Sequence, residues 1–213
     1  MILVTGATGF VGSHLVRRLR QEGIPVRAVV RTPAKAQALR DLGVEVVAGD
    51  VADPWSLIAA AEGVERIVHL VGIIQEGRGS TFRSVHVEGT RNVLEAAART
   101  GVKQFFLQSA LGTREGARSE YHRTKWEAEE LVRTGSVPFA ILRTSLIYGP
   151  GDLFTMRLAE MIRLSPVLPV IGSGRSKVQP VFVDDVVSCM VKAVTTDAFQ
   201  GRTFEIGGPD QLT

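Results

Sequence analysis

The sequence is poor in cysteine: Cys189 is its one cysteine among 213 residues. A single thiol excludes a disulfide within the chain, and scarce cysteine is typical of proteins from a reducing compartment. We therefore expect a cytoplasmic protein. Because Cys189 falls in an apolar stretch with helical spacing, a packed thiol is favoured over a reactive one.

The sequence also lacks a long apolar run. Hydrophobic residues make up 45% of the chain, but no uninterrupted stretch approaches the ~18 residues that a membrane-spanning helix needs. Met1 leads directly into an apolar, strand-like stretch, which leaves no room for a signal peptide. These features predict a soluble protein without a transmembrane segment, which could still attach to a membrane complex through its surface.

The chain also has no large excess of positive or negative charge. The chain has 25 basic and 22 acidic residues, which gives a net charge of +3. Because this excess is small and the basic residues are scattered, we expect no nucleic acid as a partner. The length indicates one domain, or one domain with a small appendage.

A glycine-rich turn follows the first apolar stretch. Its glycines are Gly6, Gly9 and Gly12, in a G-x-x-G-x-x-G pattern that leads into an amphipathic helix. Gly6 permits a tight turn, Gly9 lets backbone approach a pyrophosphate, and Gly12 lets the helix lie close to the strand. The helix N-terminus adds free N–H groups and a partial positive charge. This context favours a dinucleotide-binding turn over an ordinary glycine-rich turn.

Strand-like and helix-like stretches alternate along residues 1–150. The expected strands cover residues 2–4, 26–30, 44–48, 66–71, 103–108 and 139–143. Six β–α repeats with short connections predict an α/β protein with a Rossmann-type, doubly wound parallel sheet. We expect residues 1–150 to form the dinucleotide-binding Rossmann domain.

Two of the expected helices begin at a pair that contains proline. Thr32-Pro33 and Asp53-Pro54 each combine a residue suited to the N-cap with a proline suited to the first helical position. We therefore expect the side chains of Thr32 and Asp53 to cap these helices.

The regular alternation stops after Pro150. Residues 151–213 contain a helical pattern, a loop with several prolines, and then another helix and a short strand. We expect a small, truncated substrate-binding region here, interleaved with elements that return to the Rossmann sheet. Thr213 follows a turn, whereas a compact domain usually ends on a packed element, so we expect a further helical portion beyond it.

Tyr121 and Lys125 form a Y-x-x-x-K motif in a predicted helix. Residues i and i+4 share a helix face, so the ammonium would stabilise the phenolate and lower the tyrosine pKa from about 10 toward neutrality. Ser109 follows the fifth expected strand, at the sheet edge where ligands bind in this fold. Together the three predict an acid/base set, although each alone also fits a structural role. We expect no metal site.

The chain resembles the short-chain dehydrogenase/reductase superfamily, in its extended or atypical branch, which includes NAD-dependent epimerases and dehydratases. The matching stretches are TGATGFVG from Thr5, GDV from Gly49, HLVG from His69, VEGTRNV from Val87, QSALG from Gln108, YGPGD from Tyr148, FVDDV from Phe182 and EIGGP from Glu205. The run after the fourth strand and residues 109–112 are most similar to the group related to the nucleotide-binding accessory subunit of respiratory complex I.

The resemblance implies roles for individual residues. Tyr121 would be the general acid/base, Lys125 would hold the ribose and lower the tyrosine pKa, and Ser109 would orient the substrate. Asp50 would bond the adenine amine, with Val51 beside the ring. The other cofactor-binding residues that it implies are Gly6, Thr8, Gly9, Phe10, Val11, Gly12, Leu70, Val71 and Gly72.

His86 departs from the family pattern, which often has asparagine at this position. That departure puts a proton relay through this position in doubt. His86 could replace the asparagine in such a relay, or it could be a structural histidine.

The end of the second expected strand bears on cofactor choice. In such folds an acidic residue there binds the ribose 2′-hydroxyl of NAD, whereas a basic residue accommodates the 2′-phosphate of NADP. Here the strand ends at Arg31, Lys35 follows, and no acidic residue is nearby. A guanidinium suits a phosphate in geometry and charge. We expect NADP, with NAD as the alternative cofactor and a solvated arginine as the structural alternative.

Two functions remain open. The first is an NADP-dependent oxidoreductase, or an epimerase or dehydratase that uses transient hydride transfer, acting on a sugar nucleotide or another small carbonyl or alcohol compound. The second is a non-catalytic NADPH-binding structural or redox-sensing subunit, as in complex I. Four basic residues could meet a substrate phosphate or could be surface charge: Arg157, Arg163, Arg175 and Lys177. The sequence does not indicate an oligomeric state.

Overall fold

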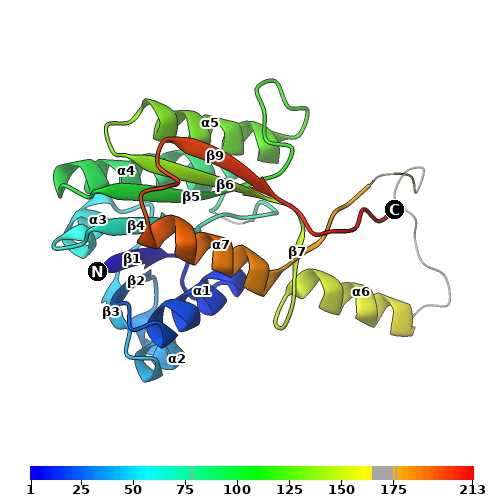
Figure 1. Cartoon of the computed structure of the whole chain (residues 1–213), viewed down its shortest axis with the longest axis horizontal. Helices are drawn as coiled ribbons and strands as arrows, with labels where there is room; N and C mark the ends of the chain where they lie inside the picture. Colours follow the sequence, from blue (N-terminus) through cyan, green and yellow to red (C-terminus); the bar gives the residue numbers. More distant parts are fainter. Residues whose placement is uncertain (78, 165–174, 176) are drawn as a thin grey trace.

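The computed structural model describes residues 1–77, 79–164, 175 and 177–213. A seven-stranded sheet forms its centre, with strand order β3-β2-β1-β4-β5-β6-β9 and parallel neighbours throughout (Figure 1). The strands are β1 (Ile2–Thr5), β2 (Val26–Val30), β3 (Glu45–Ala48), β4 (Arg66–His69), β5 (Gln104–Ala110), β6 (Phe139–Thr144) and β9 (Arg202–Ile206). The strand order reverses between β1 and β4, which is where such sheets bind ligands. The predicted Rossmann-type sheet is confirmed.

Helices cover both faces of the sheet (Figure 1). They are α1 (Phe10–Gln21), α2 (Gln37–Asp41) and α7 (Val183–Thr195) on one face, and α3 (Pro54–Ala61), α4 (Gly89–Arg99) and α5 (Glu120–Thr134) on the other. A short 3₁₀-helix, η1 (Pro33–Lys35), precedes α2, and a π-helical stretch, η2 (Arg83–Glu88), leads into α4. Each face has its own apolar core, so the sheet is buried on both sides, as its near-continuous apolar strands require.

The central strand β5 shows how the two cores are filled. Successive strand residues point to opposite faces, so Phe106 joins the core under α1 and α7, whereas Phe105 and Leu107 join the core under α3, α4 and α5. The strand continues to Ala110. Ser109 therefore lies inside the strand rather than directly after it as expected, and alternation turns its side chain toward α5.

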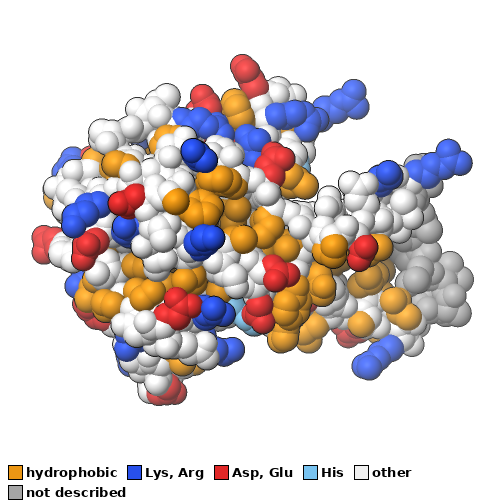
Figure 2. Space-filling view, viewed as in Figure 1, with side chains coloured by type: hydrophobic (Ala, Val, Ile, Leu, Met, Phe, Trp, Pro, Cys, Tyr) orange, Lys and Arg blue, Asp and Glu red, His pale blue; other side chains and the backbone are white. Residues whose placement is uncertain are grey.

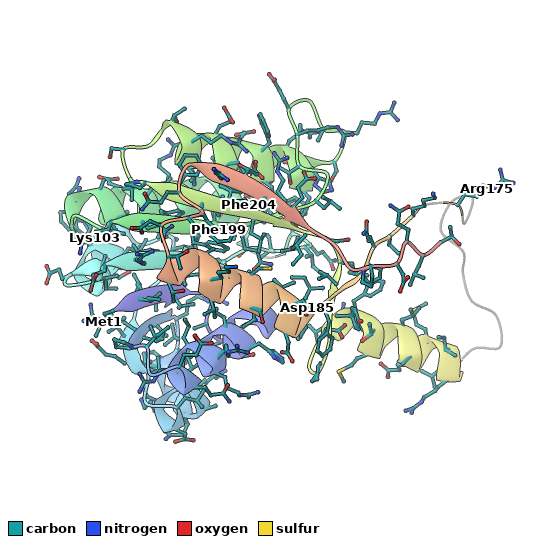
Figure 3. All side chains as sticks on the ribbon, viewed as in Figure 1. Met1, Lys103, Arg175, Asp185, Phe199 and Phe204 are labelled. Carbon is teal, nitrogen blue, oxygen red and sulfur yellow. The ribbon has the colours of Figure 1, made fainter. Side chains whose placement is uncertain are left out.

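The segment after Pro150 contributes to the main body as well as extending from it. α7 packs against α1, and β9 extends the sheet beside β6. The rings of Phe199 and Phe204 lie 4.8 Å apart where the chain enters β9 (Figure 3). A separate two-stranded parallel pair joins β7 (Ile147–Tyr148) to β8 (Val181–Phe182). The division into residues 1–150 and 151–213 stays a prediction.

Helix α6 (Leu153–Leu164) extends from β7 away from the sheet (Figure 1) and has no buried residue. Hydrophobic side chains lie on the surface over α6 in Figure 2. Its exposed large apolar residues are Leu153, Phe154, Met156, Leu158, Met161, Ile162 and Leu164. None of the helices in the described ranges combines the length and the apolar character that crossing a membrane requires.

Candidate active site

A cleft of about 400 Å³ opens at the carboxyl ends of β1 to β4. We call it the glycine cleft. The predicted cofactor residues that line it are Gly6, Thr8, Gly9, Arg31, Asp50, Val51, Leu70, Val71 and Gly72. They come from the turns after four neighbouring strands, so the parallel sheet brings them together although the sequence separates them widely.

Backbone builds the floor of the glycine cleft. Gly6 has φ +81°, a conformation that favours glycine. A Cβ on Gly12 would lie 2.1 Å from the Gly6 carbonyl oxygen, so only glycine lets α1 start this close to β1. Gly9 is the N-cap and offers no side-chain cap, and the first turn of α1 contains no acidic residue. The N–H groups of that turn and the helix dipole suit a pyrophosphate, so these residues fit a dinucleotide.

Not every predicted cofactor residue lines this cleft. Lys35 lies exposed in η1, outside the lining residues. Phe10 and Val11 line the neighbouring cavity described below. Arg31 is exposed at the end of β2 and does line the cleft. Asp50, which follows the neighbouring strand β3, also lines the cleft and accepts a hydrogen bond from the backbone N–H of Ala52 over 3.0 Å.

A second cavity, of about 750 Å³, adjoins the glycine cleft, and Leu70, Gly72 and Ile73 line both. We call it the tyrosine cavity. The three predicted catalytic residues line it: Ser109, Tyr121 and Lys125. The structure therefore brings the Y-x-x-x-K motif of α5 and the end of β5 beside the cleft that the glycine-rich turn forms.

Lys125 is buried at the junction between these two spaces. Its ammonium donates a hydrogen bond to the backbone oxygen of Gln108 over 2.9 Å. A Cβ on Gly72 would lie 3.7 Å from Nζ, so the amine faces the strip of backbone that both spaces share. Burial lowers the pKa of Lys125 to about 8, although the charge of Glu129 opposes this shift. The side chain is therefore mostly protonated at neutral pH.

Tyr121 has its pKa raised, because burial disfavours the phenolate. The expected lowering by Lys125 is wrong for this structure, in which the ammonium is bonded to the Gln108 carbonyl instead. Three rings surround the phenol edge to face, at centroid distances of 5.8 Å for Phe82, 5.4 Å for His86 and 5.1 Å for His122. This setting fixes the ring and keeps its hydroxyl protonated.

Ser109 lines the cavity, but its hydroxyl is buried. It lies beside the carboxylate of Glu129, without a hydrogen bond of normal geometry. Glu129 is fully buried and pairs with Arg133 and with Arg143 at 2.8 Å. Burial alone would raise the pKa of Glu129, but the hydrogen bonds, that from Arg143 foremost, hold it below its usual range. Whether Ser109 orients a substrate stays a prediction.

His86 connects three parts of the site. Its Nδ1 lies 2.9 Å from the hydroxyl of Thr124, and its Nε2 lies 3.1 Å from both the N–H and the C=O of Ile73. Burial and the charge of Lys125 lower its pKa to about 4, so the ring is neutral at pH 7. Both nitrogens thus have protein partners. This favours a structural histidine that ties the loop after β4 to α5.

Several cavity residues were not singled out from the sequence, among them His122, Leu146 and Val178. His122 is the first variable position of the Y-x-x-x-K motif, and its place next to Tyr121 is the signal that could have found it. Burial and the charge of Arg114 lower the pKa of His122. Leu146 and Val178 come from irregular chain after β6, where periodicity carries no information about which side faces a cavity.

The four basic residues considered for a substrate phosphate separate in space. Lys177 lines the tyrosine cavity, whereas Arg157 and Arg163 are exposed on α6. Arg175 lies far from the sheet (Figure 3) and is not a lining residue. Among the described residues, no group of three or more His, Cys, Asp or Glu side chains is placed to hold a metal ion.

Comparison with known proteins relates this architecture to characterised chains. The model of the NAD dependent epimerase/dehydratase family matches residues 2–207. Ceramide reductase of Caulobacter vibrioides is 40% identical over 90% of this chain and 60% of its own length. Subunit 9 of the NADH dehydrogenase [ubiquinone] 1 alpha subcomplex of Arabidopsis thaliana is 31% identical over 99% of this chain and 54% of its own. The chain thus spans little more than half the length of these two relatives.

A solved structure shows the same fold with ligands bound. The UDP-glucuronic acid 4-epimerase of Bacillus cereus, in complex with UDP-glucuronic acid and NAD, superimposes with a TM-score of 0.82 at 26% identity. The match covers 99% of this chain and 78% of the epimerase. The sheet, the flanking helices and the glycine-rich turn therefore belong to an architecture that binds a nicotinamide dinucleotide in that epimerase.

Proposed function

The chain belongs to the NAD-dependent epimerase/dehydratase family, and from this premise we propose that it is an NADP-dependent oxidoreductase acting on a carbonyl or alcohol compound. One observation carries the proposal. The glycine cleft, which fits a pyrophosphate, adjoins a cavity lined by Tyr121 and Lys125, and Leu70, Gly72 and Ile73 line both spaces. A dinucleotide held at Gly6 to Gly12 would extend toward these two side chains.

The chemistry divides between the cofactor and the protein. A dinucleotide held by the glycine-rich turn would supply the hydride chemistry, as donor to a carbonyl carbon or acceptor from an alcohol. Tyr121 handles the proton at the substrate oxygen. Because burial keeps its hydroxyl protonated, Tyr121 holds the proton that the oxygen of a reduced carbonyl would take up. The Lys125 ammonium lies at the junction and donates one hydrogen bond to the Gln108 carbonyl, so its other N–H groups could bond ribose hydroxyls.

The preference for NADP rests on Arg31. This exposed guanidinium lines the glycine cleft at the end of β2. Among the described lining residues the one carboxylate is that of Asp50, which follows β3 and not β2. A 2′-phosphate would meet a planar, permanently charged donor that can bind two of its oxygens. Lys35 adds a second positive charge on the same side of β2.

A second candidate is a binding subunit that holds NADPH without turnover. Its support comes from the relatives named as complex I subunits, which align with nearly the whole chain. Tyr121 and Lys125 would then serve only to hold the ribose. The chain would associate with a larger complex through its surface.

One experiment separates the two candidates. Purified protein is mixed with NADPH and a panel of aldehydes, ketones and UDP-sugars, and the nicotinamide absorbance near 340 nm is followed while products are analysed. The oxidoreductase oxidises NADPH and forms one alcohol per cofactor. Tight NADPH binding with no product from any compound would favour the binding subunit. In a parallel assay with NADP+ or NAD+ in place of NADPH, a UDP-sugar converted with no net reduction of the cofactor would instead identify an epimerase.

A further inference from the structure

We propose that the tyrosine cavity takes an uncharged substrate in which the reacting carbonyl or hydroxyl group is attached to a hydrocarbon chain. This inference rests on the proposed function, because it names the substrate class for the same Tyr121. Such a substrate differs from that of enzymes that bind a nucleoside diphosphate beside the nicotinamide.

The first argument is the charge of the cavity wall. Among its described lining residues no carboxylate occurs, and the cations are Lys125 and Lys177. Lys125 is 7% exposed and already donates to the Gln108 carbonyl. A diphosphate is bound through several positive or N–H donors, as at the start of α1. The described lining of the tyrosine cavity has no such set of donors, because Lys177 is the one cation besides Lys125 that could bind a diphosphate.

The second argument concerns the polar lining residues, several of which direct their hydrogen-bonding atoms into the protein. The Thr144 hydroxyl donates to the Ser109 carbonyl, and the Gln179 amide donates to the Gly208 carbonyl. The Ser109 hydroxyl is itself buried. Gln108, Ser145 and Gln211 are further neutral polar lining residues, which suit a carbonyl or an amide rather than an anion.

The third argument is the apolar surface, which reaches from the floor to the mouth. Phe10 and Leu146 line the cavity, and Leu70 and Ile73 line both the cavity and the glycine cleft. Ile74 and Val178 are lining residues that are 85% and 44% exposed. Exposed apolar side chains beside a cavity gain free energy when an apolar chain covers them.

The test compares chain lengths. The 213-residue protein, loaded with NADPH, is assayed with straight-chain aldehydes of four, eight and twelve carbons, and with a UDP-4-keto sugar as the charged alternative that also offers a carbonyl. Each methylene buried should raise kcat/KM about three- to fourfold until the cavity is full. Equal kcat/KM for all three aldehydes, or a higher value for the UDP-4-keto sugar, would overturn the proposal.

A binding measurement keeps the inference separate from the proposed function. Calorimetric titration of the NADPH complex with butanol, octanol and dodecanol reports affinity without turnover. Affinity that rises with chain length while no aldehyde is reduced would refute the oxidoreductase but support the apolar cavity. Ile74→Ser should weaken dodecanol binding about threefold, whereas Leu164→Ser, which removes an equally exposed side chain from α6, should leave it unchanged. An unchanged Ile74→Ser, or equal losses in both variants, would contradict it.

Discussion

The glycine cleft and the tyrosine cavity share Leu70 and Gly72, yet they are built in different ways. The cleft is made largely of backbone in the turns after adjacent strands, where a Cβ on Gly12 would strike the Gly6 carbonyl. The cavity is made largely of side chains from the start of α1, the loop after β4, β5, α5 and the chain after β6. Backbone recognition leaves little freedom for substitution, whereas a side-chain wall can change its chemistry. One turn can therefore serve relatives with different substrates.

The largest effect is expected from Gly12→Ala. Its Cβ would lie 2.1 Å from the Gly6 oxygen, so α1 must move away from β1 and its first-turn N–H groups must leave the pyrophosphate position. A shift of about 1 Å can cost roughly 100-fold, and we expect a loss of that size in NADPH affinity, measured by fluorescence titration. Gly77→Ala is the control, because a Cβ there meets nothing within 4 Å. Normal affinity in Gly12→Ala would contradict the backbone account.

Arg31→Asp should reverse the cofactor preference. The variant removes a charge-assisted contact to the 2′-phosphate and places a carboxylate where it can accept from a 2′-hydroxyl. We expect the ratio of NADPH to NADH affinity to fall by about 10- to 100-fold. Lys35→Asp tests whether charge alone is enough, since Lys35 is not a lining residue and should have the smaller effect. A wild type that binds both cofactors equally would remove the basis of the NADP assignment.

His86→Ala should disturb both spaces, because His86 bonds Ile73 on the shared wall and Thr124 beside Tyr121. Loss of these partners leaves buried polar groups unsatisfied, at a cost of about 1–3 kcal/mol. We expect kcat to fall about tenfold through misplacement of Tyr121, with a smaller change in the KM for NADPH. His86→Asn, which retains hydrogen-bonding groups, should recover part of kcat. If both variants lose only thermal stability, His86 has no positioning role.

The pH dependence of stability should be the smallest effect. Burial lowers the pKa of His69 to about 3. Burial and the positive charge of Lys125 lower the pKa of His86 to about 4. The unfolded chain therefore takes up protons first as the pH falls below 6.5, so the two histidines lower stability progressively toward pH 4 and contribute nothing to its pH dependence above pH 7. Each histidine should lower Tm by about 2–4 °C per pH unit in that window. A His86→Asn variant with the same slope as wild type, by calorimetry, would contradict this assignment.

The cleft was predictable from the sequence because its signals are local. A glycine pattern after a strand, and single residues at the ends of neighbouring strands, are sufficient when the sheet is parallel. Helix starts were partly predictable: Asp53 accepts from the N–H groups of Trp55 and Ser56 as expected. Thr32 makes no capping bond, because a three-residue 3₁₀-helix rather than an α-helix follows it.

The cavity was predictable only in its catalytic motif. Spacing places Tyr121 and Lys125 on one helix face, but it contains no information about how deeply they are buried. It also does not predict that the Gln108 carbonyl accepts a hydrogen bond from the Lys125 ammonium. The tyrosine pKa was therefore expected to fall, whereas burial raises it. The side chain of Ser109 faces Glu129 because β5 continues to Ala110 instead of ending at residue 108 as expected. Periodicity does not resolve a difference of two residues at the end of a strand.

The most direct test of the account is the effect of Tyr121→Phe on binding and turnover. The variant removes only the phenol oxygen from a ring held by Phe82, His86 and His122, so the cleft should stay intact. NADPH affinity should remain within about twofold, while kcat for the best aldehyde should fall at least ~100-fold, as expected for loss of a general acid. Turnover equal to wild type, with NADPH bound normally, would show that the proton comes from elsewhere and would contradict the proposed division between cleft and cavity.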